Sequence, residues 1–372
     1  MKLKMVAAAV AVLASNVVFA QSSVTLYGVA DIGVEYVSHA STGKSVSDAG
    51  SAVRMQSGNM STSRWGLRGV EDLGGGLKGV FALESGFALD TGAANTRLFD
   101  RQAYVGVQSN YGAVTLGRHQ TPVYDFAVAY DPMAMAPRYS LYSMDADMAS
   151  RADNSIKYVG VFGGLTASAL YSFGYDMQGA NGAGVGEKPG NARQGREYSL
   201  GLNYATGPFG IGAVYDMRQA LVTDGVDLKV QRASVAGSYA YGPAKAFLGY
   251  RWAKVTQPGA GNRSNLWWGG LGYQATPALS LTGAVYYQGY RGTKTDPWLF
   301  VASGDYALSK RTDLYMNLAY SVNRTDGNIG SQSTLGVAGT DTTIAGYPAP
   351  FAAGTAGKQN QFGAVVGVRH KF

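Results

Sequence analysis

Residues 197–204 read EYSLGLNY, and a large apolar or aromatic side chain occupies every second position of this stretch. Tyr198, Leu200, Leu202 and Tyr204 would share one face of an extended strand, with polar or small residues on the other face. A strand has this period-two pattern when one face meets lipid and the other meets water. The stretch therefore predicts one strand of a transmembrane β-barrel.

The same alternation recurs at 24–36, 311–322 and 361–372. A segment near the N-terminus and the C-terminal segment are therefore both predicted to be strands of the same sheet. Between such segments the connectors alternate in length, as periplasmic turns and external loops do in bacterial barrels. Short turns are expected at Glu71–Gly76, Ser109–Gly112, Gly163–Gly164, Thr206–Pro208, Tyr241–Pro243, Thr276–Pro277 and Leu308–Lys310. With the chain ends meeting at the same rim, these turns predict about sixteen antiparallel strands.

The long connectors are rich in Gly, Ser, Asn, Asp or Thr and are expected to be external loops. They are predicted at Ser38–Ala52, Gly174–Gly195, Arg218–Lys229, Thr256–Asn265, Gln288–Trp298 and Asn323–Gly357. The connector His119–Ala149 differs, because it carries many aromatic and apolar residues beside four aspartates. A long apolar loop is expected to pack against something, so we predict that this third loop folds into the barrel.

The first twenty residues have the pattern of a secretory signal peptide. Lys2 and Lys4 precede an apolar run, Met5–Val18, which closes with a small residue at Ala20. We therefore expect cleavage after Ala20 and treat residues 21–372 as one barrel domain. The run is short for a membrane anchor.

The composition narrows the class of protein. No later segment approaches ~18 consecutive apolar residues, so membrane-spanning helices are not expected. The absence of Cys excludes a disulfide-stapled fold. The formal net charge of +7 falls to +5 when Lys2 and Lys4 are removed with the leader, and the charges are spread along the chain. No basic cluster accompanies an element that reads nucleic acid, so no nucleic-acid partner is expected.

Three motifs invite other interpretations. Residues 74–79 read GGGLKG and fit a dinucleotide-binding pattern, but an alternating segment follows in place of a helix, which favours a turn. Asp145 and Asp147 are a carboxylate pair of the kind found in calcium loops, although such pairs are more often solvated. The three histidines, His39, His119 and His370, accompany no nucleophile motif. We therefore predict no enzyme activity, no cofactor and no metal.

Several blocks of sequence, in order along the whole chain, resemble Gram-negative porins of the β-proteobacterial type. The blocks are SVTLYGVAD (23–31), SRWGLRGVEDLG (63–74), FDRQAYVG (99–106), LGR (116–118), DNSIKY (153–158) and VRHKF (368–372). The resemblance implies a sixteen-stranded outer-membrane barrel that assembles as a homotrimer, with the third external loop folded inward. It also implies contact with outer-membrane lipid and lipopolysaccharide. The terminal Phe372 is similar to the signal that such proteins present to the barrel-insertion machinery.

In related porins, arginines on the barrel wall face acidic groups or carbonyls of the third loop, where they constrict the pore. The residues that match those positions here are Arg64, Arg101 and Arg151. Weaker candidates for the same lining are Arg68, Lys78 and Arg118, and the opposing acids are expected to be Asp125 and Asp131. The chain lacks the Pro-Glu-Phe-Gly loop motif of the enteric porins. A single inward arginine also fits a structural ion pair inside the barrel.

These features together predict an outer-membrane porin with a water-filled channel for ions and small hydrophilic solutes. Cationic groups close to a narrow path raise the barrier for cations, so we expect the channel to favour anions. A substrate-specific channel is the nearest alternative, because sugar pores line their path with aromatic residues. An outer-membrane hydrolase and an adhesin on the same barrel are more distant alternatives.

Overall fold

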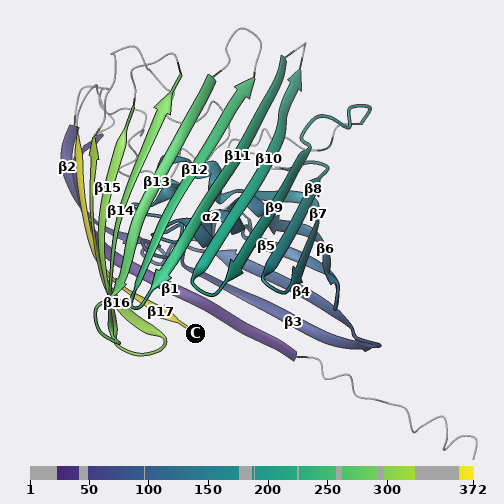
Figure 1. Cartoon of the computed structure of the whole chain (residues 1–372), viewed down its shortest axis with the longest axis horizontal. Helices are drawn as coiled ribbons and strands as arrows, with labels where there is room; N and C mark the ends of the chain where they lie inside the picture. The colour runs from purple at the N-terminus through teal and green to yellow at the C-terminus, as the bar shows by residue number, and fades with distance from the viewer. Residues whose placement is uncertain are drawn as a thin grey trace, which may run out of the picture.

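The computed structural model describes residues 23–41, 49–95, 97–175, 187, 189–223, 226–256, 262–291, 296–322 and 360–372. The predicted signal peptide lies outside these residues. The described strands form one antiparallel sheet (Figure 1). Their bounds are β1 Ser23–Ser41, β2 Ala49–Ser57, β3 Arg64–Gly74, β4 Leu77–Gly86, β5 Gln102–Ser109, β6 Gly112–Gln120, β7 Arg151–Phe162, β8 Leu165–Ser172, β9 Glu197–Thr206, β10 Phe209–Thr223, β11 Val226–Tyr241, β12 Ala244–Thr256, β13 Asn262–Gln274, β14 Leu279–Tyr290, β15 Trp298–Ala307, β16 Thr312–Val322 and β17 Gln361–Lys371.

The sheet closes on itself through β1. On one side β1 pairs with β17, from Val29 opposite Lys371 to Val37 opposite Gly363. On its other side it pairs first with β3 and then with β2. Because β2 and β3 lie one after the other along β1, the 17 described strands fill sixteen positions of a closed barrel. The predicted sixteen-stranded antiparallel barrel is confirmed.

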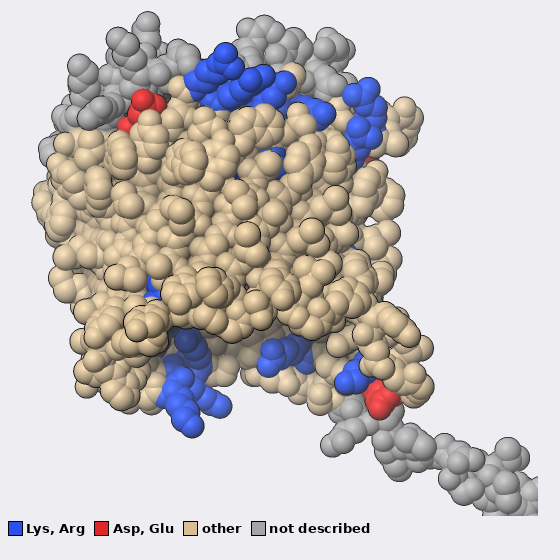
Figure 2. All heavy atoms as spheres, in the orientation of Figure 1, with Lys and Arg blue, Asp and Glu red and all other residues tan. Residues whose placement is uncertain are grey.

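The alternation that identified the strands divides the lipid face from the lumen. In β9, Glu197 and Ser199 are fully buried inside the barrel, whereas Leu200 and Leu202 are more than half exposed on the outside. A soluble protein would bury the leucines, so this inverted pattern marks an outer surface that lipid covers. Figure 2 shows the result as a broad uncharged belt around the visible face.

Aromatic side chains cluster at both edges of this belt. Near the long loops, Tyr250 packs on Trp267 and Tyr287 packs on Trp298, with ring centroids 4.3 and 4.5 Å apart. Near the short turns, Phe209 and Tyr239 pack with ring centroids 4.7 Å apart. Rings of this kind gather at the two membrane–water interfaces of outer-membrane barrels.

All seven predicted short turns connect neighbouring strands at one rim. The GGGLKG segment is the turn between β3 and β4, and its first three glycines have φ of 81°, 62° and 83°. Left-handed φ values favour glycine, because a Cβ clashes with the backbone there. The sequence requirement at this turn is therefore conformational, and the segment does not begin a helix.

One of the predicted external loops is shorter in the structure than expected. Arg218–Lys229 was expected to be a loop, but β10 continues to Thr223 and β11 begins at Val226. The pairing of β10 with β11 carries the wall higher here, and Arg218 pairs with carboxylates inside the barrel. Charged residues that belong to a lumen network look like loop residues in the sequence.

Three helical segments lie between β6 and β7 and occupy the lumen. They are α2 Pro122–Tyr130, α3 Leu141–Met144 and the 3₁₀ turn η1 Ala146–Ala149. In Figure 1, α2 is visible behind the front wall of the barrel. None of the helices in the described part of the chain is long and apolar enough to cross a membrane.

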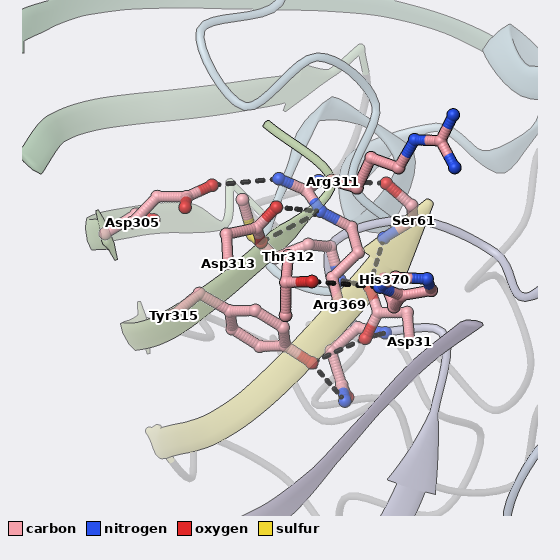
Figure 3. Close-up of polar contacts among 12 residues, drawn as sticks. Asp31, Ser61, Asp305, Arg311, Thr312, Asp313, Tyr315, Arg369 and His370 are labelled. Carbon is pink, nitrogen blue, oxygen red and sulfur yellow. Dashed lines mark hydrogen bonds and ion pairs between the residues drawn. The ribbon is translucent and has the colours of Figure 1, made fainter. Parts of the chain in front are cut away.

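A network of polar side chains holds the wall where β2 gives way to β3. The buried Asp31 carboxylate of β1 accepts hydrogen bonds from the backbone N–H groups of Asn59, Met60 and Ser61. It also accepts one from the Tyr315 hydroxyl of β16, at 2.5 Å (Figure 3). Asp31 therefore satisfies three backbone donors that the interruption of the strand leaves unpaired.

Arg369 of β17 extends this network toward the short-turn rim. Its guanidinium bonds Asp313 of β16 at 3.0 Å and Asp305 of β15 at 2.9 Å (Figure 3). A third bond, to the Ser61 hydroxyl, is 3.0 Å long. One arginine thus ties the last three strands to the start of the chain.

We expect Tyr315→Phe to weaken the barrel, because it leaves the buried Asp31 and Asn59 each without one hydrogen bond. Such a loss costs about 1–3 kcal/mol. The measurement is the half-life at a fixed high temperature of the compact form that migrates faster in unheated gel samples. The half-life should fall roughly tenfold if the transition state lacks most of this contact. Tyr306→Phe, on the lipid face of β15, is the matched control, and equal half-lives for the two variants would contradict the role of the network.

Candidate functional site

The third loop packs as a small core inside the barrel. Thr121 caps α2 by accepting a hydrogen bond from the Tyr124 backbone N–H, and Pro122 starts the helix where no N–H is needed. Phe126 is fully buried and packs edge-on against Trp268 of β13. Helix α2 thus packs against the wall of β8–β13, as the predicted inward folding requires.

Small residues of the wall make room for the loop. A Cβ on Gly212 or Gly270 would lie 2.5 Å from the Tyr130 ring or the Pro132 ring, respectively. Backbone and ring therefore touch with nothing between them at these two points. Glycine is required here for close approach, and larger residues would push the loop into the channel.

Ion pairs anchor one end of the loop to the wall. Asp145 pairs with Arg251 of β12 at 3.0 Å, and Asp147 pairs with Arg232 of β11 and Arg218 of β10. Burial alone would raise the pKa of Asp147, but the arginines outweigh it and hold the pKa below its ordinary value. The two carboxylates considered for calcium therefore serve as anchors in this structure.

The middle of the loop reaches the opposite side of the lumen. The Tyr139 hydroxyl donates to Glu35 of β1 at 2.9 Å, and Arg138 lies 3.6 Å from the same carboxylate. Arg54 of β2 completes the group with a 2.5 Å bond to Glu35. The loop thus crosses the barrel from β10–β12 to β1 and narrows the passage to the space beside β2–β7.

The three leading candidate arginines converge on that remaining wall. Arg101 bonds Glu84 of β4 at 2.6 Å, and Arg64 of β3 lies 3.6 Å from the other oxygen of the same carboxylate. Arg151, at the start of β7, lies over the Tyr124 ring of α2, with 5.4 Å from its guanidinium carbon to the ring centroid. Arg64 and Arg101 therefore lie together on the wall, and Arg151 contacts the loop at Tyr124.

Glu84 is the residue that sequence reasoning missed. It also accepts a 3.0 Å hydrogen bond from the Tyr27 hydroxyl, so it holds two arginines and one tyrosine. The signal was available, since the buried Ala82 and Glu84 alternate with the partly exposed Phe81 and Leu83, which places this carboxylate in the lumen. The opposing acids were expected in the loop, whereas Glu84 lies in strand β4.

The weaker candidates have other partners. Arg118 and Arg97 both bond Asp153, at 2.5 and 2.7 Å. Arg68 stacks over Tyr27, 5.3 Å from the ring centroid. Lys78 is exposed near the short-turn rim. These cations line the same side of the lumen, outside the Glu84 cluster.

The predicted opposing acids do not meet the arginines. Asp125 of α2 pairs with Lys157 of β7 at 2.6 Å. Asp131 is buried and accepts hydrogen bonds from the Met135 N–H at 2.8 Å and the Tyr286 hydroxyl at 2.6 Å. Burial raises the pKa of Asp131 above its ordinary value, and its hydrogen bonds oppose that rise. Its role in this structure is to hold the loop backbone together.

Phe372 lies at the barrel seam. Its backbone N–H and C=O pair with Gly28 of β1, at 3.1 and 3.0 Å, and a Cβ on Gly28 would collide with the Phe372 ring. The terminal residue is therefore the last rung of the closing strand pair. Its predicted role in insertion stays a prediction.

Comparison with known proteins shows which proteins this chain resembles. The sequence profile described as Gram-negative porin matches residues 7–328. Outer membrane porin protein 32 of Delftia acidovorans is 31% identical, with 100% of both chains covered. An outer membrane porin of Bordetella pertussis is 32% identical over 75% of this chain and 74% of its own length.

A solved porin structure has a similar fold. The anion-selective porin from Comamonas acidovorans is similar with a TM-score of 0.77 and 26% sequence identity, covering 95% of this chain and all of that one. The closed barrel, the inward third loop and the match along the chain agree with one another. The chain belongs to the Gram-negative porin family and is located in the outer membrane.

Proposed function

We propose that the chain forms a water-filled channel for passive diffusion of ions and small hydrophilic solutes and that the channel favours anions. The observation that carries the proposal is the convergence of Arg64, Arg101 and Arg151 opposite the third loop. Arg64 and Arg101 share the one carboxylate of Glu84, and Arg151 adds a third cation close to Arg101, so the group carries a net positive charge. In a narrow wet pore such a cluster attracts anions and repels cations.

Exposure decides which arginine acts on a passing ion. The Arg64 side chain is 27% exposed, whereas that of Arg101 is 5% exposed and engaged with Glu84. We assign the direct contact with ions to Arg64, and a supporting role to Arg101. The similarity to a porin described as anion-selective supports the same sign.

General diffusion is favoured over a substrate-specific channel. The loop rings that suggested a sugar path are turned to the wall, since Phe126 and Tyr139 are fully buried and Tyr130 is 4% exposed. Tyr124 is partly exposed beside Arg151. A path for a specific sugar would need several rings open to the water.

Among the described residues, a contact between His119 and Ser155 resembles catalytic machinery, but its burial disfavours a hydrolase. His119 Nδ1 lies 2.7 Å from Ser155 Oγ, and both side chains are 2% exposed. The Ser155 hydroxyl is 2.9 Å from the Gly117 carbonyl oxygen, to which it donates. A serine that is buried in this way and bonded to a backbone carbonyl is not presented to a substrate. The conduction experiment described below separates a channel from an adhesin, because an adhesin need not conduct.

We also propose a homotrimer, which the family resemblance implies. Native mass spectrometry of the detergent-solubilised protein, without heating, should give three times the mass of the mature chain. A monomer that still conducts would remove the trimer from the proposal and leave the channel intact.

Reversal potential across a planar bilayer under a potassium chloride gradient tests the proposal. We expect an anion-favouring potential for the wild type. Arg64→Glu should lower the chloride-to-potassium permeability ratio on the order of tenfold, because it reverses the exposed charge in the cluster.

Lys310→Glu is the control for this change, since it makes the same charge reversal at an exposed turn. The control should shift the ratio little, because screening weakens charges in open water. A ratio that Arg64→Glu leaves unchanged would refute the assignment to Arg64. A correctly folded wild type that does not conduct would refute the channel.

Glu84→Gln should shift the ratio in the opposite direction. The change removes the negative charge shared by Arg64 and Arg101, so the anion preference should rise by roughly twofold or more. Glu71→Gln, an exposed carboxylate near the β3–β4 turn, is the matched control. If both variants move the ratio equally, the effect comes from overall charge, and the Glu84 cluster does not set the selectivity.

A further inference from the structure

The ion pairs that anchor the third loop belong to a buried cluster whose charges do not balance. Its carboxylates are those of Asp145 and Asp147 in the loop, Glu197 of β9 and Asp216 of β10. Its cations are Arg218 of β10, Arg232 of β11 and Arg251 of β12. We call these residues the loop-anchor cluster, and none of them is more than 8% exposed. If every group were ionised, four carboxylates would face three guanidinium groups and leave one negative charge uncompensated.

A buried charge without a counter-charge is costly, and such a group takes up a proton instead. The described ion pairs of the four carboxylates are all with these three arginines. Tyr175 and Tyr290 flank the arginines, and a neutral phenol adds no charge. Arg196 precedes Glu197, and strand alternation turns its side chain to the other face of the wall. One bound proton would make the cluster neutral.

The excess negative charge lies at Glu197 and Asp216. Arg218 Nε is 3.2 Å from Glu197 Oε2 and 3.9 Å from Asp216 Oδ2. This nitrogen carries one hydrogen, so it cannot donate to both carboxylates. Asp216 Oδ2 is also 3.7 Å from Arg232 Nη1, which is too long for a hydrogen bond. Among the described residues, no donor is aligned on any of the four oxygens of this pair, whereas Asp147 accepts a hydrogen bond from Arg232.

Two further observations point to a missing hydrogen at this place. The Asp216 carboxyl is within hydrogen-bonding reach of the Glu197 carboxyl, and two acceptors in contact need a proton between them. Ser199 lies directly opposite Asp216 in the strand register, and its fully buried hydroxyl has no partner in the described part of the chain. A hydroxyl can donate one hydrogen bond but supplies no charge.

We propose that Glu197 and Asp216 share one proton at neutral pH and that this proton keeps the third loop in place. With the proton bound, one carboxyl donates to the other, and the charge of Arg218 remains for Asp147 of the loop, 3.6 Å away. Without it, the two carboxylates repel each other and compete with Asp147 for that arginine. Glu197 and Asp216 are therefore positioning residues that act through Arg218. The proposal goes beyond the channel function and does not depend on conduction or on its selectivity.

Infrared spectroscopy of the folded protein in neutral buffer tests for the proton. The wild type should show the C=O stretching band of a buried carboxylic acid that Glu197→Gln abolishes. Asp216→Asn should abolish the same band, because the remaining carboxylate then has no second carboxylate with which to share a proton. Asp313→Asn is the control, since it removes another inward carboxylate, one that Arg369 fully engages, and it should leave the band. A band that neither variant of the pair removes would overturn the proposal.

The half-life of the compact form at a fixed high temperature gives a second test. In the unfolded chain a glutamate releases its proton near about pH 4, whereas the folded pair keeps one, so wild-type stability should fall as the pH rises from there. Glu197→Gln has no such proton to lose. Its half-life should exceed that of the wild type by roughly tenfold or more at about pH 9 and by less than about twofold at about pH 5. Glu71→Gln, an exposed control, should follow the wild type at both pH values.

The double variant Glu197→Gln/Asp216→Asn separates charge balance from a general benefit of removing acids. It leaves three arginines with two carboxylates, so it should be shorter-lived than either single variant at both pH values. A further gain in the double variant would overturn the proposal. Single variants that are shorter-lived than the wild type at about pH 9 would also overturn it, because both carboxylates would then act as ionised partners of the arginines.

Discussion

The structure depends on one constraint: no backbone N–H or C=O group facing lipid can remain unpaired. A sheet satisfies this only when it has no edge, because each unpaired group in hydrocarbon costs several kcal/mol. The pairing of β1 with β17 removes the last edge, and Phe372 provides its final rung on Gly28. The place where the wall is interrupted, between β2 and β3, shows the same demand. There the Asp31 carboxylate takes over three backbone donors.

A closed barrel also encloses a lumen that has to be filled in part. A barrel of this size encloses more space than wall side chains can occupy. The third loop fills part of it by supplying an apolar core of its own, which packs on Trp268 and on the glycines at 212 and 270. The ion pair of Asp145 with Arg251 and the hydrogen bond from Tyr139 to Glu35 fix the two sides of that core to opposite walls. What remains open is a channel bounded by the loop on one side and by arginines on the other.

The sequence was informative where one local rule dominates. Period-two alternation and turn glycines predicted the strands and all seven short turns, because lipid and left-handed φ each permit few residue types. It failed where partners are distant in sequence. Arg218 looked like a loop residue because Asp147 and Glu197, which hold it in the wall, lie far from it in the chain. Asp131 and Asp145 look alike in sequence, yet one organises the loop backbone and the other pairs with an arginine.

The partners of each charged residue also decide its effect on selectivity. The number of charges in the lumen does not by itself determine the field that an ion meets. The wall arginines Arg232 and Arg251 are buried and neutralised by Asp145 and Asp147, so they act on the loop and not on solutes. Arg101 is nearly as buried beside Glu84. A charge influences a passing ion when it is both close to the path and incompletely compensated, and desolvation by the narrow wall strengthens its effect. Arg64 meets these conditions best, since it is partly exposed and shares its only described carboxylate with a closer competitor.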